Sequence, residues 1–171
     1  NIGFELLMGD YAEIESWIEN GRVVCGFLVL PVKSHLESVF LAKDRLLAVI
    51  PRNHPLAARK RFPLRALEEY PFMLLEKGSK NEITSIFEKH GLRPQIHFTT
   101  WDDYAIMAMV EKNLGISILP ELILRRVPYE VRALELEKPA SRRLGFVMKD
   151  LKNASPAVRR FMNYLQHRDE G

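Results

Sequence analysis

The segment of residues 101–121, WDDYAIMAMVEKNLGISILPE, restricts the fold of this chain more than any other. Apolar and small side chains recur at helical spacing in its first half, and Thr100 with Asp103 three residues later fits a capping box at the helix start. Asn113 and Gly115 both tolerate the left-handed backbone that a helix C-terminal cap requires. The helix is therefore predicted to end there, with a positive φ at Asn113.

The residues after that turn predict a short buried strand. Residues 116–119 are apolar and too few for a helix, and Pro120 ends the strand because proline has no N–H to donate to a ladder. Strands and capped helices alternate along the rest of the chain, which is typical of an α/β fold with a mainly parallel sheet. The predicted strands cover residues 4–8, 23–30, 41–50, 72–76, 95–100, 116–119, 132–136 and 143–148, and further helices are predicted at 11–20, 64–69 and 80–90, with a last helix opened by Ser155 and Pro156.

Two of these helices carry the same start signal as the helix after Thr100. Asp10 with Glu13 is predicted to cap the first, and Ser79 with Glu82 is predicted to cap the helix of residues 80–90. Capping residues are common in ordinary helices, so each of them has a structural explanation before any functional one.

Three segments carry a resemblance to a known family. Residues 101–121 resemble the second half of the effector-binding domain of LysR-type transcriptional regulators, where a helix leads through a Gly-Leu-Gly-Ile-like turn to a strand ending in Leu-Pro. Residues 9–31 look like the family's strand-end, helix, Gly and strand unit, and residues 43–57 look like its crossover strand and following turn. Val24 stands where the family usually has Asp, and Asn113 stands where it usually has Gly.

The resemblance implies two Rossmann-like lobes, the architecture of a type II periplasmic binding protein. The first lobe is expected to comprise residues 1–45 and 146–171, and the second residues 46–145, with two strands crossing between them. The family opens its effector domain with one further strand and helix, after a DNA-reading winged helix-turn-helix. The first lobe of this chain is therefore expected to be incomplete, and DNA contact is expected only through a missing N-terminal domain.

Composition limits the class of protein. The chain has 171 residues, 47% of them hydrophobic, which suits one soluble domain or two small lobes. Its longest apolar run, residues 23–32, is far shorter than the roughly 18 residues that a membrane helix needs, so no membrane contact is expected. No signal peptide is read at the N-terminus, and a single cysteine, Cys25, suits a core position in a reducing cytoplasm. The net charge of +3 comes from scattered pairs of basic residues rather than from a DNA-binding stripe.

The candidate ligand site lies in the turns after the strands, because ligands of open α/β sheets bind beyond the carboxyl ends of strands. Ser79 and Thr100 would stand at helix N-termini, which favour a carboxylate or another electron-rich group. Asp10 would repel an anion unless Lys77 neutralises it, so a zwitterionic or neutral effector is expected. With the family resemblance, the predicted effector-binding residues are Gly9, Asp10, Lys77, Gly78, Ser79, Thr100 and Pro120.

The sequence predicts no enzyme, no cofactor and no metal site. It contains no nucleophile elbow, glycine-rich phosphate loop or HExxH motif, and its five histidines have no metal-ligand spacing. Asp102 and Asp103 point in different directions on a helix, so they are interpreted as acids that complement its dipole.

The leading hypothesis is the effector-sensing and oligomerising domain of a cytoplasmic bacterial LysR-type regulator, which is expected to bind a small metabolite between its two lobes and so control DNA-bound activity. An extracytoplasmic solute-binding protein and an enzyme on the same cleft fold are the alternatives. The resemblance also implies a homodimer or homotetramer of the full-length protein, formed side by side through the strands of residues 4–8 and 95–100 and the helix of residues 80–90.

Overall fold

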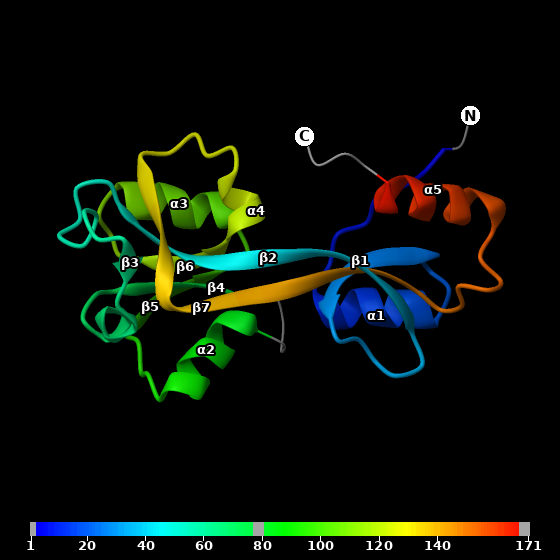
Figure 1. The fold of residues 1–171 in the computed structure, drawn as a ribbon, viewed down its shortest axis with the longest axis horizontal. Helices are drawn as coiled ribbons and strands as arrows, with labels where there is room; N and C mark the ends of the chain where they lie inside the picture. The colour runs from blue at the N-terminus through cyan, green and yellow to red at the C-terminus, as the bar shows by residue number, and fades with distance from the viewer. Residues whose placement is uncertain (1–2, 77–80, 168–171) are drawn as a thin grey trace. The chain divides into compact units, whose positions relative to one another are not determined.

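The computed structural model describes residues 3–76 and 81–167. The chain divides into two compact units: unit 1 is Asn1–Lys43 with Arg143–Gly171, and unit 2 is Asp44–Arg142. Two long strands, β2 (Glu37–Pro51) and β7 (Val131–Met148), contribute to both units (Figure 1). The lobe boundaries predicted from the sequence fall on these same two strands.

Unit 1 is a short sheet with a helix on each side. Strand β1 (Cys25–Leu30) pairs antiparallel with the end of β7, and α1 (Tyr11–Glu19) and α5 (Pro156–Gln166) lie on opposite sides of β1 (Figure 1). Alternate residues of β7 serve the two faces. Val147 packs with Ile18 of α1, whereas Phe146 packs with Leu165 of α5.

The predicted caps of unit 1 are confirmed. The Asp10 carboxylate accepts the Glu13 N–H at 2.7 Å, and Glu13 Oε2 accepts the Asp10 N–H at 3.0 Å. At the other helix, the Ser155 hydroxyl accepts the Val158 N–H at 3.3 Å with Pro156 in the first turn. Both helices therefore begin where the sequence predicts.

The predicted strand of residues 4–8 is wrong. Residues 3–10 form no helix or strand in the part of the chain that the structure describes, and Phe4, Leu6 and Met8 are exposed. A strand needs a neighbour for its backbone hydrogen bonds, and no described strand pairs with this segment. Its alternating apolar pattern could indicate side-chain directions but not whether a partner strand is present.

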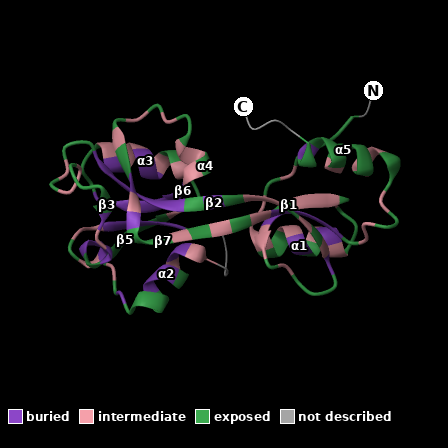
Figure 2. Ribbon diagram, viewed as in Figure 1, coloured by how far each residue is buried: buried purple, intermediate pink, exposed green. Residues whose placement is uncertain are grey.

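Unit 2 contains most of the described elements and the larger core. Besides its parts of β2 and β7, its elements are β3 (Arg61–Phe62), the 3-10 helix η1 (Leu64–Glu68), β4 (Phe72–Leu75), α2 (Glu82–His90), β5 (Ile96–Thr100), α3 (Asp103–Glu111), β6 (Ser117–Pro120) and α4 (Glu121–Leu124). All residues of β4 and β6 are buried (Figure 2). Helices α2 and α3 lie on opposite sides of these strands (Figure 1).

The larger sheet is mixed and mostly antiparallel, so the prediction of a mainly parallel sheet is wrong for it. Strand β4 runs parallel to β5, and β3 runs parallel to β7. The pairs β1–β7 and β2–β6 are antiparallel. In the larger sheet β2 and β7 are also neighbours, and they run in opposite chain directions because β2 enters unit 2 while β7 leaves it.

Two predicted helix starts in unit 2 are also wrong. Asn81 caps α2 by accepting the Ile83 N–H at 2.9 Å, and Asp102 caps α3 by accepting the Tyr104 N–H at 2.9 Å. The predicted capping box of Thr100 does not form, because Thr100 is still paired with Leu75 in the sheet. The predicted cap Ser79 lies outside the described residues, and α2 begins only after Asn81.

The end of α3 follows the prediction. Asn113 has φ 61°, a left-handed conformation, and the Leu114 N–H donates to the Met109 carbonyl at 3.1 Å. Gly115 lies so close to β4 that an added Cβ would come within 2.4 Å of the Pro71 carbonyl oxygen. This turn therefore needs its small residue for close packing as well as for backbone freedom.

Candidate functional site

Three described strands of unit 2 end at the same edge. Strands β4 and β5 are parallel, with Leu75 opposite Thr100, and a parallel bridge joins Phe72 to Ile116 just before β6. The Glu76 N–H donates to the Thr100 carbonyl at 3.1 Å. Because parallel strands end on one side, the chain leaves the sheet there at Glu76, Thr100 and Pro120.

This edge holds part of the predicted effector site. Thr100 ends β5 and Pro120 ends β6. Lys77, Gly78 and Ser79 follow β4 in the sequence but lie outside the described residues. We call the ends of β4, β5 and β6, at Glu76, Thr100 and Pro120, the strand-end edge of unit 2.

The start of α3 differs electrostatically from the expectation. The Thr100 hydroxyl accepts the Asp102 N–H at 3.2 Å, and Asp102 itself accepts the N–H groups of Tyr104 and Ala105. Asp102 therefore already supplies a negative charge to the first amides of α3, with Asp103 beside it. Since the helix end is already complemented in this way, it attracts an anionic ligand less strongly than an end capped by threonine.

The start of α2 has a neutral cap and an acidic residue that is paired with an arginine. Asn81 Oδ1 caps the helix, while Asn81 Nδ2 donates to the Leu75 carbonyl at 3.1 Å, which joins the helix start to the end of β4. Glu82 Oε1 accepts from the Arg142 guanidinium at 3.1 Å. Sequence reasoning missed Asn81 and Arg142. The Asn81 signal was available, because asparagine is a strong N-cap residue.

In unit 1, the predicted residues Gly9 and Asp10 lie at the start of α1. Asp10 is engaged as the helix cap, and an added Cβ on Gly9 would come within 2.6 Å of the Trp17 ring. Both positions therefore have a structural explanation, and a role in effector binding stays a prediction.

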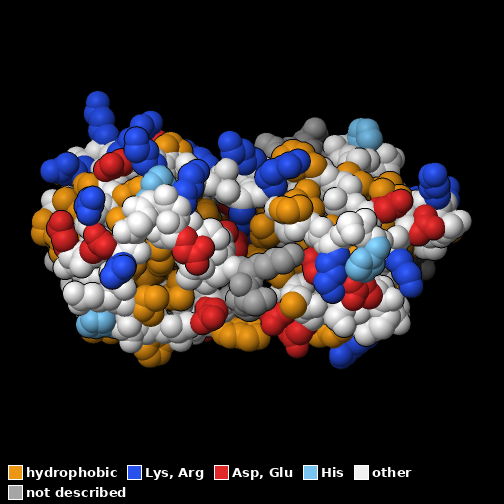
Figure 3. Space-filling view, turned by 90° about the horizontal axis from the view of Figure 1, so that it is seen from below, with side chains coloured by type: hydrophobic (Ala, Val, Ile, Leu, Met, Phe, Trp, Pro, Cys, Tyr) orange, Lys and Arg blue, Asp and Glu red, His pale blue; other side chains and the backbone are white. Residues whose placement is uncertain are grey.

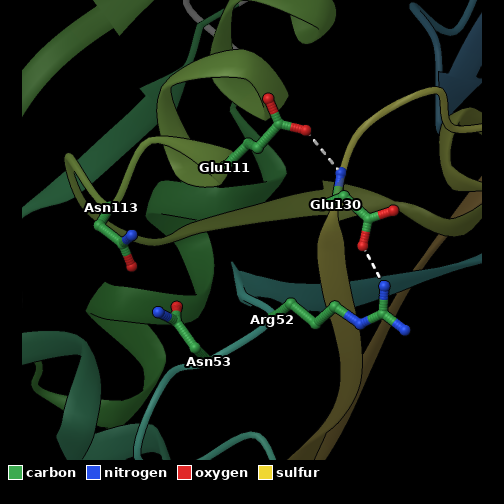
Figure 4. Close-up of a pocket in the computed structure, with 5 residues that line it drawn as sticks. All are labelled: Arg52, Asn53, Glu111, Asn113 and Glu130. Carbon is green, nitrogen blue, oxygen red and sulfur yellow. Dashed lines mark hydrogen bonds and ion pairs between the residues drawn. The ribbon is translucent and has the colours of Figure 1, made fainter.

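A surface pocket of about 290 Å³ lies elsewhere in unit 2 (Figure 4). Its lining residues are Arg52, Asn53, Glu111, Asn113 and Glu130. Arg52 pairs with Glu130, and Glu111 accepts the Glu130 N–H at 2.8 Å. The pocket is at the C-terminal end of α3, about 13 Å along the helix from the strand-end edge. Of the predicted effector-binding residues that the structure describes, Gly9, Asp10, Thr100 and Pro120, none is among these lining residues.

The described residues offer little for catalysis. Among residues 3–76 and 81–167, no group of three or more His, Cys, Asp or Glu side chains could hold a metal ion. Burial raises the pKa of the Cys25 thiol, which keeps it protonated and weakly nucleophilic. No helix in this part of the chain is long and apolar enough to cross a membrane.

Charged side chains do not form a tract of one sign on the face shown in Figure 3. Lys and Arg side chains there alternate with Asp and Glu side chains over both units. Several of the basic residues of unit 2 are neutralised in pairs, among them Arg45 with Glu121 and Arg61 with Glu135. This distribution is typical of a solvated protein surface.

Comparison with known proteins decides the family. Residues 1–170 match the model of the LysR substrate binding domain. This chain belongs to that family. The fold of a LysR domain is that of a type II periplasmic binding protein, and the membership favours a regulator over the solute-binding protein that the sequence left open.

Relatives of the LysR domain agree in sequence and in structure. The uncharacterized HTH-type transcriptional regulator YvbU of Bacillus subtilis is 26% identical over 156 residues, which cover 90% of this chain and 53% of that protein. The regulatory domain of CcmR from Synechocystis PCC6803, solved with 2-PG, has a TM-score of 0.81 at 23% identity. The match covers 92% of this chain and 78% of the CcmR chain. The effector binding domain of QuiR, solved with shikimate, has a TM-score of 0.78 at 23% identity. The match covers 92% of this chain and 77% of the QuiR chain. The chain spans about half the length of the curated relatives it matches.

Proposed function

We propose that this LysR domain is the effector-sensing and oligomerising part of a cytoplasmic transcription regulator, and that it binds a small metabolite at the strand-end edge of unit 2. The observation that carries the proposal is the common edge at which β4, β5 and β6 end, in a domain of this family. The solved relatives with 2-PG and shikimate support a small molecule as the ligand. We further propose that DNA is contacted by a part of the intact protein outside these residues.

The proposed site contains Thr100 and Pro120, together with Lys77, Gly78 and Ser79, which follow β4 in the sequence. Its test is a thermal-shift screen of the 171-residue chain against a metabolite panel, followed by calorimetry on each hit. A ligand at about 100 times its Kd stabilises the domain by about 2.7 kcal/mol, which such a screen detects.

Paired variants locate the site. Ser79→Ala with Thr100→Ala should weaken a hit at least tenfold, while Thr100→Ser keeps the hydroxyl that accepts the Asp102 N–H and should bind nearly normally. Asn53→Ala, in the pocket at the other end of α3, is the matched control. If a hit binds the Ser79→Ala/Thr100→Ala variant with unchanged affinity but no longer binds Asn53→Ala, the ligand lies in that pocket and the proposed site is refuted.

The effector's charge is testable at Asp10. We propose that Gly9 and Asp10 also contribute to effector binding, and that the effector is zwitterionic or neutral. Asp10→Asn removes the charge but keeps a side-chain oxygen that can cap α1. Weaker binding of the hit in this variant fits a ligand with a cationic group. Tighter binding would instead identify an anion that Asp10 repels.

We also propose that the domain is not an enzyme and performs no turnover on its effector. Incubation of each hit with the chain, followed by mass spectrometry, should return the hit unchanged. A product that accumulates in proportion to protein concentration would contradict this.

The oligomerising surface that we propose includes β5 and the outer face of α2. Ile96 and Phe98 on β5 are 46% and 50% exposed, large values for apolar side chains in a strand. Among the described strands, β5 pairs only with β4, so one edge of it is open to a partner. On α2, Ile83, Ile86 and Phe87 are buried in the core of unit 2, which leaves the opposite face of the helix for a partner. The proposed assembly is a homodimer or homotetramer of the intact regulator.

Light scattering on the intact regulator tests this surface. Phe98→Asp should shift a dimer or tetramer toward smaller species, because a charge would have to be buried in the interface. Leu114→Asp, which places the same change at another exposed apolar side chain of unit 2, is the control. A strictly monomeric intact protein, or equal effects of the two variants, would exclude β5 as the interface.

A further inference from the structure

A buried group of three charged residues joins separate elements of unit 2. Asp44 on β2 has a fully buried side chain, and Arg142 on β7 is only 11% exposed. The Arg142 Nε donates to Asp44 Oδ2 at 2.9 Å, and another guanidinium nitrogen donates to Glu82 Oε1 at 3.1 Å. One guanidinium therefore holds two carboxylates, one from a strand and one from the first residue of α2.

The second oxygen of Asp44 extends the group to another helix. Asp44 Oδ1 accepts the Leu122 N–H at 3.0 Å, at the start of α4. A buried carboxylate is stable only when its oxygens are paired, and here Arg142 pairs one oxygen and the helix amide pairs the other. Arg142 is therefore linked by hydrogen bonds to the start of α2 directly and to the start of α4 through Asp44.

The group lies at the boundary of unit 2 and close in the sequence to predicted effector-binding residues. Asp44 and Arg142 are the first and last residues of unit 2, on the two strands that continue into unit 1. In the sequence, Glu82 follows closely after Lys77, Gly78 and Ser79, which are predicted effector-binding residues. The α4 helix follows directly after Pro120 of the strand-end edge.

We propose that Arg142 is a positioning residue that couples the first turn of α2 to the first turn of α4 and to the two strands leading to unit 1. A ligand that moves the start of α2 displaces Glu82, which shifts the guanidinium and, through Asp44, the Leu122 amide and β2. This inference rests on the proposed function for the source of the movement. The coupling itself exists without any ligand.

Hydrogen exchange on the 171-residue chain, followed by mass spectrometry of peptides, tests the coupling without an effector. The decisive variant is Glu82→Gln, which weakens the bond to Arg142 at a partly exposed position and leaves Asp44 and α4 unaltered. Exchange in α4 should rise at least about twofold, the lower end of the coupling found between residues within one charged network. Arg142→Gln should raise exchange at the starts of α2 and α4 together.

Two controls separate coupling from general destabilisation. Arg143→Gln removes the same charge from the next residue of β7, whose exposed side chain lies over the Phe40 ring, and should leave both helix starts unchanged. Arg142→Lys keeps the charge but lacks the planar guanidinium that binds two carboxylates at once. Exchange should therefore be faster than in the unaltered chain at one helix start or both. If Arg142→Gln does not fold, Glu82→Gln still decides.

The proposal is overturned if Glu82→Gln accelerates exchange only in α2, or if Arg143→Gln has the same effect as Arg142→Gln. Such a result would leave the proposed effector site intact, because that site is tested by ligand binding to the Ser79 and Thr100 variants. Conversely, a failed metabolite screen would not change the exchange result.

Discussion

Asn113 offers the sharpest test of the turn that ends α3. Its φ of 61° is a conformation that costs an ordinary L-residue about 1–2 kcal/mol, and a β-branched side chain tolerates it least. Asn113→Val should therefore lower the free energy of unfolding of unit 2 by about 1–2 kcal/mol. Asn113→Gly should be nearly neutral, because glycine adopts this backbone without strain but loses more chain entropy on folding.

Urea unfolding monitored by tryptophan fluorescence measures the difference. The chain has two tryptophans, Trp17 in unit 1 and Trp101 in unit 2, so a Trp17→Phe background reports unit 2 alone. With a urea m-value of about 2 kcal/mol/M, the Val variant should unfold at about 0.5–1 M less urea than the Gly variant. Ala at the same position, which is strained but not branched, should lie between them.

The reasoning fails if the Val and Gly variants unfold at the same urea concentration. If that shared urea concentration lies below the midpoint of the unaltered chain, the Asn113 side chain, not its backbone, stabilises the turn. Because Asn113 lines the surface pocket, a crystal structure of the Gly variant would then be needed to identify the lost contact.

Two further predictions concern polar groups of unit 2, the half-buried His54 and the buried Ser117. His54 Nδ1 accepts the Leu56 N–H, and burial lowers the His54 pKa, so the neutral ring stabilises the fold. This stabilisation is fully present above the unfolded pKa of about 6.5 and is lost as pH falls through the folded pKa. The urea midpoint should therefore drop between pH 7.5 and 5.5, and it should drop less in His54→Asn, which keeps an acceptor that does not titrate. The fully buried Ser117 hydroxyl donates to the Met73 carbonyl at 2.7 Å. Ser117→Ala should therefore lower the free energy of unfolding, measured in urea, by about 1–2 kcal/mol. An unchanged midpoint would show that this bond does not stabilise the contact between β4 and β6.

Features set by a few neighbouring residues could be read from the sequence. The Asp10–Glu13 capping box and the left-handed Asn113 are local, because the interacting atoms lie within three or four residues of each other. The family resemblance added the arrangement of two lobes, which no local pattern contains.

Competition between good caps explains the helix starts that were misplaced. Thr100 is followed within two residues by Asp102, which caps at least as well, so propensity alone could not choose between them. Pairing in the sheet decides between them. Thr100 pairs with Leu75 in the strand ladder, so the helix can begin only after it. The strand predicted at residues 4–8 failed for a related reason, because strand formation depends on a neighbour that its own residues do not specify.

The pairing of Asp44 with Arg142 lay beyond sequence reasoning, since the two residues are 98 positions apart and each is ordinary in its own segment. Their separation also explains why the pair suits a coupling role. A contact within one helix can report only on that helix, whereas this pair is intact only when β2 and β7 are correctly aligned and the start of α4 is in place. Replacing the pair by apolar residues could keep or even raise stability, as it does for many buried ion pairs. A loss of coupling without a loss of stability in such a variant would therefore separate the role of Arg142 in transmission from its role in folding.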